Sequence, residues 1–259
     1  MKRNTYVGVA LILLIIGGIV LYFSMRPAPT KAPATASEAA IILPATGYSE
    51  HTKYYDITAS YATSTPLLRS VGPASDVAAR SLMLGFVRDT IQNFKTDGNF
   101  ANLTSEDIKV MGFDKGRKET LDITYRIASS PRTVSYIFTI YQDTLGAHGN
   151  TFFRTVTFNT KTGAPLALAD VFSPGTNYLT TLSSISRTKL PGIIGQGADM
   201  TFIKNGTEPK KENFQSFYLD AKNFVILFAP YAVAPYSSGA QTLRIPLSQL
   251  SSILKPEYR

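Results

Sequence analysis

Two short segments carry side chains whose types suit ligand recognition. The first is Gly146-Ala147-His148-Gly149-Asn150, which lies between two expected strands. Its glycines would let a ligand approach the backbone closely, while the imidazole of His148 donates a hydrogen bond. The alternative is structural: Gly146 and Gly149 allow a tight connection between strands, and His148 fastens the loop to its neighbours. The sequence favours this alternative, because nothing nearby supplies a second catalytic group.

The second segment, residues 228–239, is rich in proline and tyrosine. Tyr231 and Tyr236 could present aromatic faces to a sugar ring or to a partner protein, because tyrosine has an apolar body and a polar tip. Equally, both rings could pack onto a sheet and order the loop. The candidate ligand-binding residues are therefore Gly146, Ala147, His148, Tyr231 and Tyr236.

The composition argues against catalysis. The chain has no cysteine and only two histidines, His51 and His148. Thiolate metal sites, cysteine nucleophiles and sites with several histidine ligands are therefore excluded. A Ser-His-Asp triad would have to use one of these histidines, and neither lies near a nucleophile-elbow pattern. We interpret His51, close to the expected linker, as solvated.

The remaining signals for chemistry are equally weak. No glycine motif for binding phosphates or dinucleotides occurs in the sequence. Asp143 and Asp170 could act as acid–base partners, but Asp170 is better interpreted as a turn or helix cap before Phe172. We therefore predict no catalytic residue, no metal site and no cofactor.

The net charge of +8 does not indicate a nucleic-acid partner. Four of the 26 basic residues, Lys2, Arg3, Arg26 and Lys31, flank an apolar run near the N-terminus, and no acidic residue precedes Glu38. The rest of the chain is only mildly basic. It has no run of lysine and arginine with interleaved aromatic residues, so we predict no nucleic-acid binding.

Residues 6–24 form an uncharged, mostly aliphatic run that is long enough to cross a bilayer as one helix. Lys2 and Arg3 precede it, so the positive-inside bias keeps residues 1–5 in the cytoplasm as a short stub. We predict a single-pass anchor in the cell membrane with the C-terminal part outside. Residues 25–47, rich in proline, alanine and threonine, are the expected linker.

The alternative to an uncleaved anchor is a secretory signal peptide. Ala34-Thr35-Ala36 has the residue types of a cleavage site, but it lies well past the apolar run, with charged and proline residues between them. The run also exceeds the usual length of a signal-peptide core. No cysteine follows it, so lipid attachment there is excluded.

The exported part alternates between strand and helix patterns. Period-two alternation and turn residues predict strands at 54–61, 121–127, 134–140, 152–158, 214–219, 224–228 and 242–247. Helical spacing predicts helices at 76–94, 177–190 and 248–254. The strand at 224–228 is apolar at every position, so we expect it to be central and covered on both faces.

These elements predict an α+β fold. We expect two adjoining subdomains of antiparallel strands packed with a few helices, preceded by the single transmembrane helix. The first subdomain would span residues 48–146, and the second would span residues 147–259.

Several motifs occur in a fixed order. They are Gly146-Ala147-His148, Thr162-Gly163, Leu168 with Asp170-Val171-Phe172, the segment 228–239 and Ile245-Pro246-Leu247. Together they resemble a bacterial extracytoplasmic module. That module occurs in the lysozyme-sensing transmembrane anti-sigma factor and ahead of the catalytic domain of a peptidoglycan deacetylase. The match covers roughly residues 50–254, in two halves that meet near Gly146.

The resemblance implies a sensing or binding module. In that family, the anti-sigma factor binds its sigma factor through a cytoplasmic domain, and the deacetylase carries a metal-dependent catalytic domain. Here only five residues precede the apolar run and the sequence ends at Arg259, so we expect neither sigma-factor binding nor deacetylation. We expect a membrane-anchored module that recognises peptidoglycan or a wall-active protein such as lysozyme, without catalysis of its own. The alternatives are a wall-glycan deacetylase or hydrolase, and an accessory subunit of a membrane complex.

Overall fold

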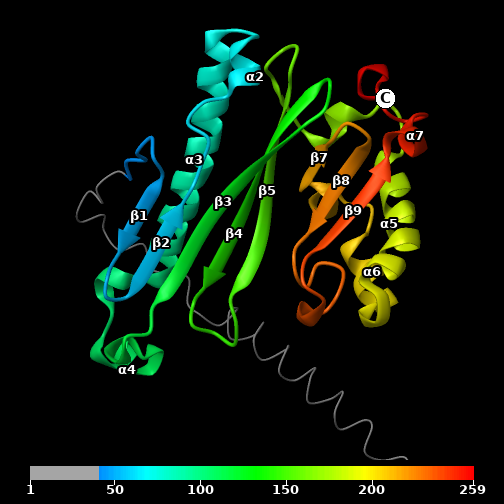
Figure 1. Ribbon diagram of the computed structural model, residues 1–259. Coiled ribbons are helices and arrows are strands. Elements are labelled where there is room, and N and C mark those ends of the chain that lie inside the picture. Colours follow the sequence, from blue (N-terminus) through cyan, green and yellow to red (C-terminus); the bar gives the residue numbers. More distant parts are fainter. Residues whose placement is uncertain (1–40) are drawn as a thin grey trace, which may run out of the picture. The chain divides into compact units, whose positions relative to one another are not determined.

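A six-stranded sheet and a three-stranded sheet, each with helices on one side, form the described part of the chain (Figure 1). The computed structural model describes residues 41–259, of which Leu43–Arg259 make up one unit. The predicted stub, the anchor and the linker up to residue 40 lie outside the described residues. Within residues 41–259, no helix has both the length and the apolarity needed to cross a membrane.

The large sheet follows the order of the chain from β1 to β6. Its strands are β1 (Tyr48–His51), β2 (Tyr55–Ala59), β3 (Glu119–Ser129), β4 (Thr133–Asp143), β5 (Asn150–Asn159) and β6 (Pro165–Leu166). Neighbouring strands are antiparallel except β2 and β3, which are parallel. A parallel pair needs a long crossover. Here the crossover contains α2 (Pro66–Arg69), α3 (Pro73–Gly98) and α4 (Ser105–Met111).

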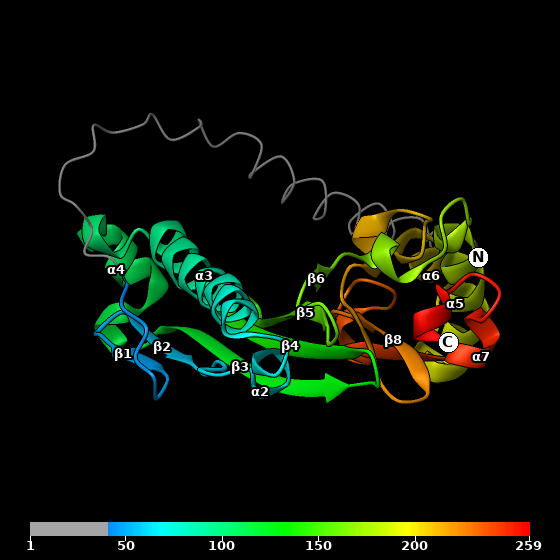
Figure 2. The same cartoon turned by 90° about the horizontal axis from the view of Figure 1, so that it is seen from above.

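Helix α3 covers one face of the large sheet (Figure 2). Its buried apolar residues repeat every three or four positions, as a helix packed on a sheet requires. They are Ala79, Met83, Val87, Ile91 and Phe94. The predicted stripe therefore holds except at Leu84, which is half-buried, while Met83 takes its place. The helix also starts at Pro73, earlier than predicted, because proline fits the first turn, where no N–H partner is needed.

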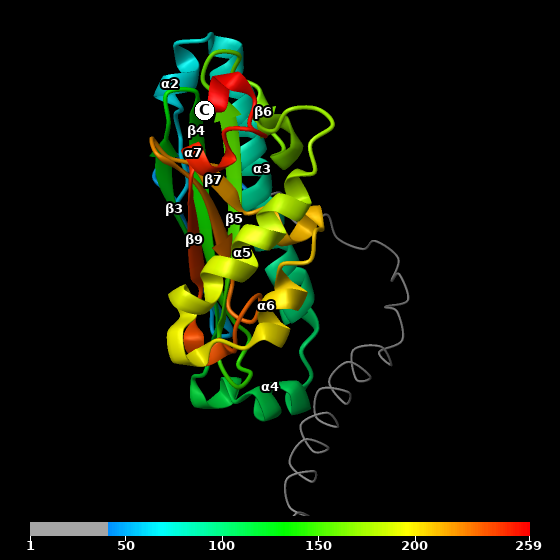
Figure 3. The same cartoon turned by 90° about the vertical axis from the view of Figure 1, so that its right-hand side faces the viewer.

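The small sheet packs between the large sheet and a second set of helices. Its strands are β7 (Phe217–Leu219), β8 (Asn223–Phe228) and β9 (Gln241–Pro246), and its helices are α5 (Tyr178–Ile194), α6 (Met200–Gly206) and α7 (Leu247–Leu250). Figure 3 shows α5 and α6 in front of this sheet. Phe224 and Ile226 of β8 join the core beneath α5, while Val225 and Leu227 contact Ile137 of β4. The prediction that β8 is central and covered on both faces is confirmed.

Strand β4 is also buried on both faces, which its alternating pattern did not indicate. Residues 133–138 are all buried. The ring of Phe138 packs against Phe86 of α3, with centroids 5.3 Å apart, while Ile137 points to the small sheet. Side chains also join the two sheets along β5, where Thr155 Oγ1 accepts a hydrogen bond from the backbone N of Phe217 at 3.0 Å.

The expected boundary between subdomains, at residues 146 and 147, falls in the loop that joins β4 to β5. These two strands pair along their length, from Thr133 opposite Asn159 to Gln142 opposite Asn150. The large sheet therefore continues across this boundary, because the second strand of the pair belongs to the same sheet. The division into two subdomains stays a prediction.

Several element ends differ from the predictions. Residues before Phe217 form a short 3-10 helix instead of a strand, and α5 continues through Pro191, whose carbonyl accepts a hydrogen bond from the N of Gly195. The last helix ends at Leu250, and β1 was not predicted at all. The 3-10 helices are Phe100–Asn102, Phe113–Lys115, Leu168–Val171, Gly195–Gly197, Lys211–Phe214, Tyr236–Ser238 and Pro256–Tyr258.

Candidate functional site

The structure brings together the loop between β4 and β5 and the loop between β8 and β9, at the lower end of both sheets in Figure 1. The ring of His148 stacks on that of Tyr236, with centroids 3.7 Å apart and an interplanar angle of 17°. His148 Nε2 lies 3.1 Å from the hydroxyl of Tyr231. We call His148, Tyr231 and Tyr236 the aromatic cluster.

The loop before β5 is fixed by contacts that side chains make to its backbone. The hydroxyl of Tyr236 donates a hydrogen bond of 2.8 Å to the carbonyl of Gly149, and His148 Nδ1 lies 3.1 Å from the same oxygen. Gly149 is buried against the ring of Tyr141, where a Cβ atom would clash. Asp143 Oδ1 accepts a hydrogen bond from the N of Leu145 at 2.8 Å, so this carboxylate stabilises the turn.

The loop after β8 is fixed in a strained conformation. Tyr231 has a φ of 68°, in the left-handed region that costs a side chain with a Cβ about 1 kcal/mol. The carbonyl of Ala232 packs directly against Gly206, the last residue of α6, where a Cβ atom would overlap it. Strain of this kind persists only where the surroundings enforce it, and it gathers at binding sites.

The cluster is accessible from solvent. Tyr231 is 51% exposed and His148 is exposed, while Tyr236 is half-buried beneath the imidazole. Of the other candidate residues, Gly146 and Ala147 lie exposed in the same loop. A Cβ atom on Gly146 would meet no atom within 4 Å, so close packing does not require a glycine there.

A pocket of about 250 Å³ is lined in part by the loop between β8 and β9, but not by His148, Tyr231 or Tyr236. The pocket is lined by Ala229 and Ala232 of the loop between β8 and β9, together with Phe152 and Phe153 of β5. Glu212 and Asn213 add polar groups to its wall. The cluster itself offers exposed rings for stacking and polar atoms for hydrogen bonds, and the pocket is a separate feature of the same loop.

The aromatic cluster is built from stacked rings and hydrogen bonds. Its hydrogen bonds join an imidazole, two phenols and a backbone carbonyl, without a carboxylate or an aliphatic hydroxyl. In the described range 41–259, no group of three or more metal-binding side chains occurs. Asp170, which the sequence assigned to a cap, accepts a hydrogen bond from the N of Ala167 at 2.8 Å, as predicted.

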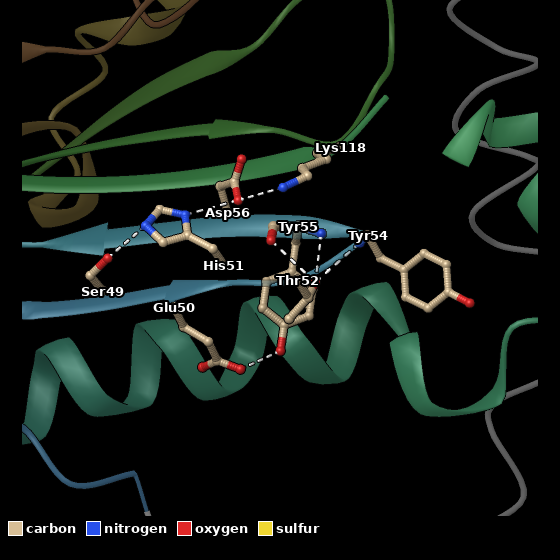
Figure 4. A network of polar contacts seen from close by, with 8 residues as sticks. All are labelled: Ser49, Glu50, His51, Thr52, Tyr54, Tyr55, Asp56 and Lys118. Carbon is tan, nitrogen blue, oxygen red and sulfur yellow. Dashed lines mark hydrogen bonds and ion pairs between the residues drawn. The ribbon is translucent and has the colours of Figure 1, made fainter. Parts of the chain in front are cut away.

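A second polar arrangement, which was not predicted from the sequence, lies at the hairpin of β1 and β2 (Figure 4). His51 is exposed, as expected, but both of its ring nitrogens have partners. Nε2 lies 2.8 Å from the hydroxyl of Ser49, and Nδ1 lies 2.9 Å from Asp56 Oδ1. Lys118, which directly precedes β3, also forms an ion pair with Asp56: its Nζ lies 3.0 Å from Asp56 Oδ1. The spacing Ser-x-His on a strand, with an aspartate across the hairpin, was the available signal.

The fold is that of an α+β domain, and the aromatic cluster lies on its surface. Residues 169–248 match the family model described as "Protein of unknown function (DUF3298)", so a DUF3298 domain is present here. Tyr231 and Tyr236 lie inside the matched segment, and His148 lies outside it. A crystal structure of a DUF3298 family member from Bacteroides fragilis has a similar fold, with a TM-score of 0.54 at 15% identity. That likeness covers 81% of this chain and 91% of the other.

Two curated proteins are similar in sequence. The peptidoglycan-N-acetylmuramic acid deacetylase PdaC of Bacillus subtilis is 34% identical over 143 residues, which are 55% of this chain and 31% of the deacetylase. The esterase Rv3036c of Mycobacterium tuberculosis is 27% identical over 118 residues, which are 46% of this chain and 51% of the esterase. The chain thus spans about a third to a half of the curated relatives that it matches.

Proposed function

We propose that this chain is a binding module of the bacterial cell envelope that recognises the glycan of peptidoglycan through the aromatic cluster. The observation that carries the proposal is the meeting of His148 with Tyr231 and Tyr236, from loops 83 residues apart in sequence. Sugars offer an apolar ring face and many hydroxyls. An exposed tyrosine ring beside an imidazole complements both features, because each has an apolar face and a polar tip.

Similarity to a peptidoglycan deacetylase supports a wall-related ligand. Recognition at the aromatic cluster would be binding without chemistry, because no carboxylate or aliphatic hydroxyl takes part in its hydrogen bonds. The resemblance to the module of the lysozyme-sensing anti-sigma factor supports a second candidate ligand, a lysozyme-like protein.

We further propose that the module is tethered outside the cell. Residues 6–24 would span the cell membrane once, with residues 1–5 in the cytoplasm, and the proline-rich linker would hold the folded part away from the lipid surface. Support for this comes from the sequence alone. The tether would keep the aromatic cluster close to the wall.

A pull-down tests the proposal. The full chain, purified in detergent micelles, is incubated with insoluble peptidoglycan and, separately, with immobilised lysozyme. We expect it to co-sediment with peptidoglycan. Tyr231→Asn should weaken binding about two- to twelvefold, because it removes a ring contact worth about 0.5–1.5 kcal/mol. Asparagine tolerates positive φ, so the loop keeps its conformation.

Matched variants make this test specific. Val110→Ala alters an apolar side chain on α4 that is 72% exposed, so it should leave binding unchanged. His148→Ala should weaken binding like Tyr231→Asn, since Tyr236 loses its stacking partner. If the chain binds immobilised lysozyme but not peptidoglycan, the proposed glycan ligand is wrong and the ligand is a lysozyme-like protein. Failure to bind either material would refute a recognition role for the cluster.

A further inference from the structure

We propose that Ser49, His51 and Asp56 form a nucleophile, base and carboxylate relay that hydrolyses short-chain acyl esters. This activity goes beyond binding at the aromatic cluster and uses different residues. The atoms have the order that such a relay requires: the hydroxyl of Ser49 faces His51 Nε2 at 2.8 Å, and Asp56 Oδ1 faces Nδ1 at 2.9 Å (Figure 4).

The hairpin places the three side chains on one face. Ser49 and His51 are two positions apart on β1, so both point to the same side of the strand. Asp56 lies directly opposite His51 in the register of β1 and β2. Thr52 closes the turn between the strands, since its Oγ1 accepts hydrogen bonds from the backbone N of Tyr54 and Tyr55 at 3.1 and 3.0 Å.

The other face of the hairpin is fastened to α3, which keeps the relay in place. Glu50 points away from His51 and forms an ion pair of 2.5 Å with Lys95 of α3. It also accepts a hydrogen bond of 2.6 Å from the hydroxyl of Tyr55. Burial would raise the pKa of Glu50, but hydrogen bonds from Lys95, Tyr48 and Tyr55 outweigh it and lower the pKa. Glu50 therefore stays charged and paired.

Asp56 and Lys118 are positioning residues for the imidazole. Hydrogen bonds from His51 and Lys118 lower the pKa of Asp56, so its carboxylate is ionised at neutral pH. An ionised carboxylate favours the tautomer of His51 that carries its proton on Nδ1. That tautomer leaves Nε2 free to accept the proton of the Ser49 hydroxyl, as a general base must.

An open hollow gives a substrate access to the nucleophile. Ser49 lines a depression of about 410 Å³, which is also lined by Gly47, Thr58, Asp122 and Thr124. The wall carries several hydroxyl groups and the carboxylate of Asp122, so it suits a small acyl ester of a polar alcohol more than a lipid. Among residues 41–259, β1 is the edge of the sheet, so in this range the N–H groups on its outer side have no partner strand and can donate to a developing oxyanion.

The reaction follows from these positions. His51 Nε2 takes the hydroxyl proton of Ser49 while Oγ bonds to the carbonyl carbon of the ester. The bond from that carbon to the alcohol oxygen then breaks, and the imidazolium returns its proton to the leaving alkoxide. An acyl group remains on Ser49. A solvent water, deprotonated by His51, attacks the acyl carbon; the bond to Oγ breaks, Oγ regains the proton, and the carboxylic acid leaves.

The test uses the full chain in detergent micelles with p-nitrophenyl acetate as substrate and a fluorophosphonate as a covalent probe. We expect slow hydrolysis and labelling at Ser49. Ser49→Ala should abolish labelling, and His51→Gln should lower kcat at least about a hundredfold, because a general base contributes 10²–10⁴-fold. Asp56→Asn should lower kcat while KM stays within twofold, as expected for a residue that orients the base.

Ser81→Ala is the matched control, because Ser81 is an exposed serine on α3 that takes no part in the relay. It should hydrolyse and label like the wild type. Circular dichroism and thermal melting must show all variants folded. The inference is wrong if the wild type neither hydrolyses the ester nor reacts with the probe, or if Ser49→Ala keeps the wild-type rate. Peptidoglycan binding, measured on the same samples, reports separately on the aromatic cluster.

Discussion

Gly206→Ala is expected to lower the free energy of unfolding by about 3 kcal/mol, because the new methyl group would overlap a backbone carbonyl that cannot rotate away. The nearest atoms to that methyl group are the carbonyl of Ala232 and Val233 Cγ1, the latter at 2.9 Å. Both belong to a loop that is fixed at its two ends by β8 and β9. Relief therefore requires the whole loop to move away from α6.

The same displacement should reach the aromatic cluster. Ala232 directly follows Tyr231, so moving it pulls the tyrosine hydroxyl away from His148 Nε2. We expect Gly206→Ala to weaken peptidoglycan binding as well as stability. Urea unfolding followed by circular dichroism measures the first effect, as a lower midpoint with an unchanged slope.

Gly85→Ala separates this clash from the general effect of replacing a helical glycine. A Cβ atom on Gly85, in the middle of α3, would meet nothing within 4 Å. This variant should therefore gain about 0.5–1 kcal/mol, because alanine loses less backbone entropy in a helix. A loss below about 1 kcal/mol for Gly206→Ala would contradict the close packing of α6 against the loop.

Glu119→Gln is expected to change how stability depends on pH. Glu119 is 6% exposed at the start of β3. Burial, helped by the charge of Asp143, raises the pKa of this carboxyl from 4.5 to about 7. The folded chain therefore holds its proton over a range where the unfolded chain has lost it. Stability from the neutral carboxyl is fully present below pH 4.5 and is lost as the pH rises through about 7.

A shift of this size corresponds to about 2–3 kcal/mol between pH 4.5 and pH 8. Glutamine stays neutral throughout, so Glu119→Gln should be about that much more stable than the wild type at pH 8, relative to their difference at pH 4.5. Urea unfolding at both pH values measures it. Asp89→Asn, at an exposed carboxylate on α3, is the matched control. Equal pH profiles for Glu119→Gln and the wild type would show that Glu119 is ionised in the folded state.

The sequence predicted elements better than it predicted their contacts. The spacing of Val87, Ile91 and Phe94 indicated the buried face of α3, because helical periodicity is local. The second buried face of β4 could not be predicted, since Ile137 is covered by strands that come about eighty residues later. The same limit applied to the site. His148 and Tyr236 were each recognised as candidates, but their stacking depends on how two distant loops meet.

The relay at Ser49 was missed for a different reason. His51 was interpreted as solvated because it stands beside a linker-like segment, and β1 is too short for a clear alternating pattern. Only the pairing of β1 with β2 brings Asp56 opposite His51. Tight hairpins between a polar linker and a first predicted strand therefore merit a search for cross-strand serine, histidine and aspartate.

The parallel pairing of β2 with β3 also has a consequence for folding kinetics. The contact between Ser60 and Ile123 spans 63 residues, and within residues 41–259 the β1–β2 hairpin joins the rest of the sheet through the pairing of β2 with β3. Closing a loop of this length costs entropy before any strand pairing compensates for it. The long β3–β4–β5 meander, whose neighbours are close in sequence, should therefore form first. The β1–β2 hairpin should pair with β3 late in folding and should unfold locally before the rest of the sheet. Its backbone amides should therefore exchange hydrogen faster than those of β4.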